Sequence, residues 1–278
     1  MNFSRKLIFF SALLFISFQS YSQSFSVSQI LTQTFDRISK ISSLKYTFTN
    51  FERINGKLLD GKMIIKMQSK PRKVYAYMEK PSTGSQVLFV EGANDGNVLY
   101  IPTSFPYLNL NLDPYGSLLR DKNHHTIHKV GFDHISKILS NAYKRFPSSF
   151  KLMGDTVWKK RSCYVIKAEF SDYKIVDYKM IAGQNLMEIA RIKNLSEYKL
   201  LELNNLSDYS FLKVGQTIKI PTVYAKKIIM FIDKQNFLPI FQKIYDEKSL
   251  FEQYEFTDIQ VNPVINSLEF TEKFIDKN

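Results

Sequence analysis

Three of the four histidines lie close together, at positions 124, 125 and 128, and two imidazoles in such a cluster could converge on a metal ion. Asp121 is the one carboxylate near them, and no cysteine is near. Because zinc sites usually need three or four well-placed ligands, we do not expect His124, His125 and His128 to hold a metal. The fourth histidine, His134, is expected on the surface of a helix.

Cys163 is the single cysteine, so an intramolecular disulfide is impossible and a buried core must stabilise the chain. Its apolar neighbours, residues 164–166, indicate a buried thiol and no activated nucleophile. The sequence also contains no Gly-x-Ser-x-Gly elbow, phosphate loop or dinucleotide fingerprint. We therefore expect a protein that is not an enzyme, with no catalytic residues and no cofactor.

The first residues resemble a secretion signal. Arg5 and Lys6 precede an apolar run, residues 7–18, that is too short to span a bilayer. The small residues Ser20 and Ser22 then give the pattern read by signal peptidase. We expect cleavage after Ser22, with an uncleaved anchor as the alternative, and export to the periplasm or cell envelope of a Gram-negative bacterium.

The formal net charge is +12, with lysine and arginine spread along the chain. This distribution favours a solvated basic surface, and attraction to anionic lipid headgroups or wall polymers is the alternative. Nucleic acid is not expected as a partner, because no basic-aromatic recognition motif is present.

Hydrophobic periodicity predicts two helices, at residues 26–41 and 132–146, where apolar residues recur at helical spacing. Elsewhere the period is two. Short strands are predicted at 44–54, 63–67, 74–78, 87–90, 98–101, 108–112, 150–156, 162–170, 227–233, 240–245 and 252–259. Turn formers separate them, with Asn55-Gly56 the strongest hairpin signal. The short connections predict an antiparallel sheet, since parallel pairing needs long crossovers.

One segment departs from this period-two pattern of apolar residues. Between residues 177 and 221 the period becomes helical, with one stripe at Leu186, Ile189 and Ala190 and another at residues 200–203. Strand-like pieces at 178–181 and 217–220 flank the two stripes. The order strand, helix, helix, strand predicts a small domain inserted in a hairpin connection, a kind of position that tolerates insertions.

This segment resembles a LysM domain. The matching residues are Tyr178, the turn 182–186, Ile189-Ala190, the run 200–204 and the final stretch 212–221. The resemblance implies binding of peptidoglycan or another N-acetylglucosamine (GlcNAc)-containing glycan in a shallow groove between two loops. The implied glycan-binding residues are Gly183, Gln184, Asn185, Leu186, Leu206, Leu212, Lys213 and Val214.

The segment departs from the LysM pattern after the glycine, where Gln184-Asn185 replaces the usual Asp-Thr or Asp-Ser. Asn185 can still cap the first helix, but Gln184 lacks the charge. A purely structural module therefore stays open beside glycan binding.

The rest of the chain resembles an uncharacterised exported bacterial family with a LolA-like half-barrel. The resemblance rests on 66–75, 86–96, 112–114, 123–131, 232–239, 245–246 and 256–263. It implies a curved antiparallel sheet around helices, with an apolar cavity suited to lipid or lipoprotein acyl chains. Candidate cavity residues are Phe48, Met63 and Met78, and ordinary core packing is the alternative for each.

The predicted fold class is therefore α+β, a curved antiparallel β half-barrel with covering helices plus an inserted βααβ module. The predicted division is signal peptide 1–22, host 23–176, LysM insert 177–222 and host 223–278. The leading function is an envelope protein that binds peptidoglycan through LysM, with an apolar ligand as the candidate for its LolA-like host domain. The alternatives are a lipid or lipoprotein carrier with a non-binding insert, and a wall hydrolase targeted by LysM.

Overall fold

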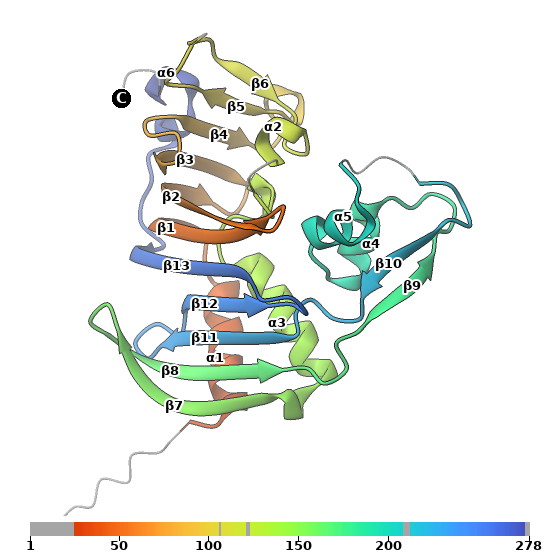
Figure 1. Cartoon of the computed structure of the whole chain (residues 1–278). Helices are drawn as coiled ribbons and strands as arrows, with labels where there is room; N and C mark the ends of the chain where they lie inside the picture. The colour runs from red at the N-terminus through yellow and green to blue at the C-terminus, as the bar shows by residue number, and fades with distance from the viewer. Residues whose placement is uncertain (1–24, 106, 121–122, 208–211, 276–278) are drawn as a thin grey trace, which may run out of the picture.

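The computed structural model describes residues 25–105, 107–120, 123–207 and 212–275 (Figure 1). The expected signal peptide and Asp121 lie outside these residues. The large sheet has eleven strands in the order β6-β5-β4-β3-β2-β1-β13-β12-β11-β8-β7, and β9 and β10 form a second sheet. The strands of the large sheet are β1 (Ser43–Ile54), β2 (Lys57–Gln68), β3 (Lys73–Lys80), β4 (Gln86–Val90), β5 (Val98–Ile101), β6 (Leu110–Leu112), β7 (Phe150–Trp158), β8 (Arg161–Glu169), β11 (Lys227–Asp233), β12 (Pro239–Tyr245) and β13 (Leu250–Val261).

All pairings between the described strands are antiparallel, and the sequence explains the hairpins that join them. Asn55 and Gly56 connect β1 to β2 with φ of 49° and 78°. Two successive positive φ values are what a tight two-residue hairpin needs, and Asn-Gly supplies them at low cost. Between β12 and β13, the Asp246 carboxylate accepts the backbone N–H groups of Lys248 and Ser249 and closes the turn.

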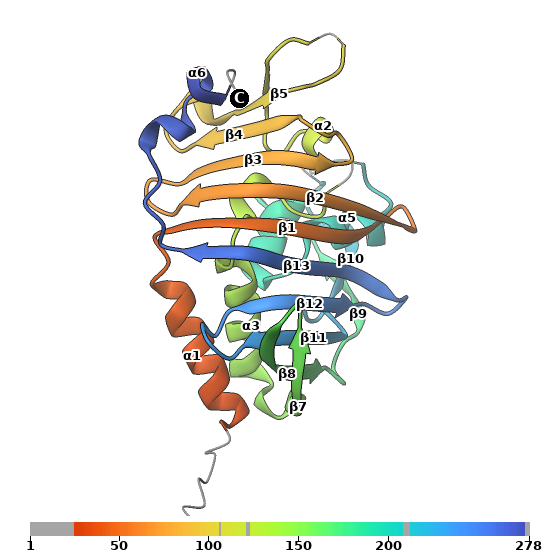
Figure 2. The same cartoon turned by 90° about the vertical axis from the view of Figure 1, so that its left-hand side faces the viewer.

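Two long helices, α1 (Val27–Ser39) and α3 (Asp133–Arg145), pack at the end of the sheet that contains β11, β8 and β7 (Figures 1 and 2). Their predicted apolar stripes enter the main core together with one face of the sheet. On the opposite face, η4 (Ser267–Phe270) and α6 (Glu272–Ile275) bring Phe270 and Ile275 against Tyr75 and Leu88. The sheet is therefore covered on both faces at different ends.

Short helical turns complete the host: η1 (Asn94–Gly96), α2 (Ser117–Arg120), η2 (Ile127–Lys129) and η3 (Pro147–Ser149). Cys163 is fully buried, as predicted. One predicted strand is shorter than expected, because Leu108 is exposed and the strand begins at Leu110. Within the described part of the chain, no helix is both long enough and apolar enough to cross a membrane.

The chain leaves the large sheet after β8 and returns at β11, and these two strands are neighbours. The intervening insert consists of β9 (Ile175–Lys179), α4 (Leu186–Lys193), α5 (Glu197–Asn204) and β10 (Thr217–Pro221). It has a core of its own, which contains Met180, Leu186, Ile189, Ala190, Leu195, Leu200, Leu201, Ile218 and Ile220. The predicted α+β class, an open antiparallel sheet with helices and a separate βααβ unit, is confirmed.

Within the insert, the residues expected to turn the chain and to begin and end the helices do so. Gly183 turns the chain into α4 with φ of 78°, a value that glycine adopts without strain. The Asn185 side chain caps α4 by accepting the Glu188 N–H at 2.9 Å. Asn205 ends α5 in the left-handed region, with φ of 52°. Leu203, expected in the small core, is only half-buried.

Candidate functional site

The resemblance to LysM assigns two loops to the groove. Both lie at the end of the β9–β10 ribbon that is farther from the host. Host connections are made at the other end, where Ile175 pairs with Pro221. The loops are joined, because the Gly215 N–H donates to the carbonyl oxygen of Met180 at 2.8 Å and the Met180 N–H donates to the carbonyl oxygen of Gln216 at 2.8 Å. The two loops are therefore joined by backbone hydrogen bonds where they leave the ribbon.

The groove candidates differ in accessibility. Gly183, Lys213 and Val214 are exposed, and the side chain of Val214 is 70% exposed. No atom lies within 4 Å of the position that a Cβ on Gly183 would take. Gln184, Asn185, Leu206 and Leu212 are half-buried, whereas Leu186 is fully buried and supports the loops from beneath.

Gln184 and Asn185 each use one side-chain atom within the insert. Gln184 Oε1 accepts the Tyr178 hydroxyl at 2.8 Å, and Asn185 Oδ1 accepts the helix-capping N–H. Both side chains therefore point their amide oxygens inward. The amide nitrogens are the groups that remain to donate to an acetamido oxygen of a sugar.

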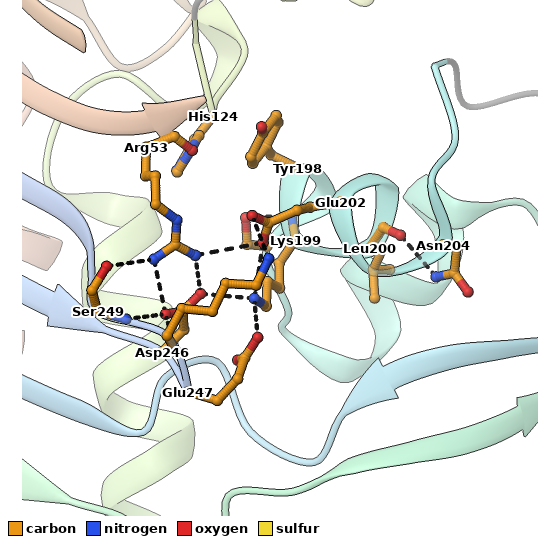
Figure 3. A network of polar contacts seen from close by, with 12 residues as sticks. Arg53, His124, Tyr198, Lys199, Leu200, Glu202, Asn204, Asp246, Glu247 and Ser249 are labelled. Atoms are coloured by element: carbon orange, nitrogen blue, oxygen red, sulfur yellow. Dashed lines mark hydrogen bonds and ion pairs between the residues drawn. The ribbon is translucent and has the colours of Figure 1, made fainter. Parts of the chain in front are cut away.

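The opposite side of the insert is docked on the host, a feature that sequence analysis missed. Glu197, Tyr198 and Lys199, at the start of α5, are all buried. The ammonium of Lys199 donates to three carboxylates, Asp246 and Glu247 at 2.7 Å and Glu202 at 2.9 Å (Figure 3). Two of these three carboxylates belong to the β12–β13 turn of the host, so α5 is bound to that turn.

Arg53, near the end of β1, completes this network from the host side (Figure 3). Its guanidinium forms a forked pair with Asp246 and also donates to the Ser249 hydroxyl at 3.1 Å. Burial alone would raise the pKa of Asp246, but hydrogen bonds from Arg53 and Lys199 outweigh it and hold the pKa well below its usual range. The carboxylate is therefore ionised at all ordinary pH values.

A second polar cluster lies beneath Tyr198. Glu52 on β1 and Glu252 on β13 are direct cross-strand partners, and both are buried. Like charges in this arrangement repel. His124 compensates them: its backbone N–H donates to Glu52 at 2.8 Å, and its Nδ1 lies 2.9 Å from Glu252. Its ring is stacked on Tyr198 at 4.4 Å.

The hydrogen bonds of His124 indicate its protonation state. Nε2 lies 3.0 Å from the carbonyl oxygen of Arg53, which can only accept, and Nδ1 faces a carboxylate. Both nitrogens must therefore donate. Burial would lower the pKa of His124, but the carboxylates of Glu52 and Glu252 outweigh burial and raise it above the ordinary value. His124 is a buried imidazolium.

The other histidines do not join it in a metal site. Among the described residues, no group of three or more histidine, cysteine, aspartate or glutamate side chains is arranged to hold a metal ion. His125 instead contacts Glu252 at 3.3 Å, and the His128 ring packs against Phe89. His134 is half-buried rather than on the surface, in a cleft of about 90 Å³ between α3 and the insert, because the docked insert covers it.

The three apolar candidates lie side by side. Phe48 on β1 pairs with Met63 on β2, and Met63 pairs with Met78 on β3. All three are half-buried, and the Phe48 ring packs 5.1 Å from that of Phe256. Two clefts among the described residues, of about 460 and 90 Å³, are lined by other side chains.

Comparison with family models identifies the insert. Residues 178–221 match the LysM domain. Residues 41–171 match a protein family of unknown function, DUF1571. The expected LysM resemblance is therefore confirmed over the whole βααβ unit, and the first part of the host is similar to a family of unknown function. A comparison with curated proteins gives no match.

Solved structures similar to the chain are distant in sequence. A putative outer membrane lipoprotein-sorting protein domain from Vibrio parahaemolyticus is 10% identical, with 88% of this chain and 96% of that chain covered and a TM-score of 0.37. Lipoprotein LppX of Mycobacterium tuberculosis is 12% identical, with 86% and 99% covered and a TM-score of 0.41. A LolA superfamily protein from Nitrosomonas europaea is 9% identical, with 90% and 100% covered and a TM-score of 0.31.

Proposed function

We propose that this protein is an exported cell-envelope protein that binds peptidoglycan, or another GlcNAc-containing glycan, through the groove of its LysM insert. The observation that carries the proposal is the two-sidedness of the insert. Its α5 face is buried on the host, while the loops that contain Gly183 and Val214 are exposed at the far end. A glycan can therefore reach the groove without displacing the host.

The chemistry of the groove supports a sugar ligand. The side-chain amides of Gln184 and Asn185 offer N–H donors, and the exposed side chains of Ile181 and Val214 offer apolar surface for the face of a sugar ring. A single shallow site of this kind binds weakly, so repeated sites on a polymer would strengthen attachment. The proposed role is binding rather than catalysis.

Cosedimentation of the mature protein with purified sacculi tests the proposal. A Gly183→Trp variant should lose most of the bound fraction, because the indole would occupy the open space over the groove. Gly92→Trp is the matched control, since Gly92 also has a positive φ, 80°, and open space around it, but lies in a host loop. Equal sedimentation of the two variants, or none by the parent protein, would refute glycan binding through this groove.

Export is tested separately. We expect the protein in the periplasmic or envelope fraction, with Gln23 as its first residue after cleavage at Ser22. N-terminal sequencing of protein recovered from cell fractions checks this expectation. Full-length protein in the cytoplasm would contradict it.

A second candidate function, carriage of an apolar ligand, is favoured by the row formed by Phe48, Met63 and Met78 on neighbouring strands. An acyl chain could lie along such a row once its neighbours move apart. Lipid extraction and mass spectrometry of protein purified from its native envelope would test this, with a Met63→Lys variant as the comparison. Protein with no co-purifying lipid would count against carriage and leave glycan binding untouched.

A further inference from the structure

The docked insert covers a pair of host histidines. His134 on α3 and His125, in the segment before η2, place their ring centres 4.8 Å apart. Nε2 of His134 and Nδ1 of His125 are buried, and neither atom has a hydrogen-bond partner among the described residues. A charged imidazole needs an acceptor at both of its nitrogens, so the surroundings of His134 suit a neutral ring.

The cover over His134 consists of structural residues of the insert. The cleft of about 90 Å³ that His134 lines is bounded on its other side by α4 and the start of α5, including Ala190, Asn194 and Leu195. Ala190 and Leu195 belong to the apolar core of the insert. They cannot turn away individually without disrupting that core. Solvent therefore reaches the whole ring of His134 only when the insert moves as a unit.

The groups around His134 do not favour a positive charge. They are Lys137 on α3, His125 and Lys129 before and within η2, Glu252 on β13, Tyr224 before β11, and Arg191 and Glu197 of the insert. The two carboxylates already have cationic partners, since Glu197 pairs with Lys129 at 2.9 Å and Glu252 with His124 at 2.9 Å. A proton added to His134 would thus find no uncommitted carboxylate in these surroundings.

The ionic contacts of the docking face are insensitive to mild acid. Burial alone would raise the pKa values of Asp246 and Glu202. Hydrogen bonds from Arg53 and Lys199 to Asp246, and from Lys199 to Glu202, outweigh burial and hold both pKa values below their usual ranges. His124 is already charged when the insert is docked, and the carboxylates that hold it belong to the host. His134 is therefore the covered group whose protonation the docked insert opposes.

The connections of the insert permit such a movement. Residues 170–174 lead from β8 to β9, and residues 222–226 lead from β10 to β11 (Figure 1). Phe170 and residues 223–225 are buried in the host core, whereas residues 171, 172 and 174 are exposed. Thr222 joins the two connections, because its N–H donates to the carbonyl oxygen of Lys174 and its hydroxyl to that of Asp172. The insert can bend about this joined pair without unfolding.

From this arrangement we propose that docking of the insert is an acid-sensitive switch, in which mild acid releases α4 and α5 from the host and exposes a protonated His134 to solvent. The inference goes beyond glycan binding and does not depend on it. A docked insert is held on the β12–β13 turn, whereas a released insert is attached through its two connections alone. The pH would therefore set the orientation of the insert relative to the large sheet.

Hydrogen exchange of the Asn55 backbone N–H, followed by NMR on the mature protein, tests the proposal. This N–H donates across the interface to the Tyr198 hydroxyl at 2.8 Å. In the released state His134 has an ordinary pKa of about 6.5, so each pH unit below this value favours release by up to about tenfold. Corrected for the intrinsic pH dependence of exchange, opening at Asn55 should increase by up to about 30-fold between pH 7 and pH 5. Amides of β11 and β12 should not respond.

Variants identify the responsible group. His134→Phe keeps an aromatic ring but cannot bind a proton, and opening at Asn55 should then be the same at pH 7 and pH 5. His134→Gln should behave alike and covers the case in which phenylalanine disturbs the packing. The matched control is His128→Phe, because burial also lowers the pKa of His128 while its ring packs on the host rings of Phe89 and Tyr115. This control should keep the response of the parent protein.

Three outcomes would overturn the inference. Opening at Asn55 that is equal at pH 7 and pH 5 in the parent protein would mean that acid does not act on docking. A response that persists in both His134 variants would assign the effect to another group. Opening of β11 and β12 by the same factor as Asn55 would mean that acid loosens the whole chain and not the docked insert. None of these outcomes bears on glycan binding, which cosedimentation at neutral pH tests separately.

Discussion

The interior of the insert and its docking face on the host are stabilised in opposite ways. The interior is apolar, and Leu186, Leu200 and Ile218 are almost completely removed from solvent. The docking face, one turn of helix away, is built from Lys199, Glu197 and their ionic partners. One short helix, α5, thus contributes to an apolar core with one side and to a buried charge network with the other.

This contrast separates what makes the insert fold from what sets its orientation. Apolar burial is non-directional and gives the small unit stability of its own. Buried ion pairs add little net stability, because desolvation of the charges offsets their attraction, but loss of one partner is costly. The network therefore makes one docked arrangement far better than others. The tests below act on one side of the comparison at a time.

The largest effect is expected when the docking network loses one charge. Asp246→Asn keeps an acceptor for the turn but removes the buried carboxylate that Lys199 and Arg53 share, and should lower the free energy of unfolding by about 3–5 kcal/mol. Urea unfolding measures it. Asp60→Asn is the control, since its ion pair with Lys80 is exposed and should contribute less than about 1 kcal/mol. Equal losses in the two variants would mean that the buried docking charges stabilise the fold no more than an exposed ion pair does.

A cavity in the apolar interior should cost slightly less and act elsewhere. Leu200→Ala removes a fully buried side chain and should cost about 2–4 kcal/mol. Hydrogen exchange should show faster opening of α4 and α5 with the large sheet unchanged. Ile192→Ala, at an exposed position of α4, should change stability by less than about 0.5 kcal/mol. Opening of the whole chain together would show that the insert has no stability of its own.

A smaller effect is expected at the contact between the two regions. The hydroxyl of Tyr198 accepts the backbone N–H of Asn55 in the β1–β2 hairpin at 2.8 Å. Tyr198→Phe keeps the stacking on His124 but leaves this N–H without its partner, at a cost of about 1 kcal/mol. Thermal unfolding measures the change. Tyr107→Phe, on an exposed loop, should leave the midpoint unchanged, and a similar shift in both would refute the contact's role.

The last test concerns pH and the imidazolium beneath Tyr198. Because the pKa of His124 is raised in the folded protein, the folded state binds its proton more tightly than the unfolded state. This contribution is fully present below the unfolded pKa of about 6.5 and is lost as pH rises through the folded pKa. We expect the free energy of unfolding to fall with rising pH in this window, and His124→Gln to flatten the slope. An unchanged slope in the variant would contradict this assignment.

His134 should act in the opposite direction. Burial, with a smaller contribution from nearby His125, holds the pKa of His134 well below its usual value, so the ring is neutral in the folded protein. As the pH falls below about 6.5, the His134 ring binds a proton in the unfolded state but not in the folded state. The free energy of unfolding therefore falls. Histidine titration followed by NMR distinguishes the two rings, because His124 should lose its proton at a higher pH than His134.

Local patterns were enough to predict most elements and the insert. The Asn55-Gly56 turn, the two long helices and the βααβ order follow from residues within a few positions of each other. The LysM resemblance predicts the two groove loops from sequence. That the implied groove residues bind sugar stays a prediction.

The docking network could not be predicted in the same way, because its partners are far apart in the chain. Arg53 and Asp246 are separated by 193 positions, and Lys199 and Asp246 by 47. In a sequence each of these residues looks like a solvated charge. A weak signal was available in Glu52 and Arg53, two adjacent charges in an otherwise alternating strand.

The attachment of the insert at both of its ends has a mechanical consequence. The chain enters at Ile175 and leaves at Pro221, which are paired, and these ends continue into β8 and β11, which are also paired. A domain on one linker can swivel, whereas two anchor points side by side resist torque. If the insert binds a glycan as proposed, tension on the insert would be passed along both connections into two paired interior strands of the large sheet rather than into a single linker.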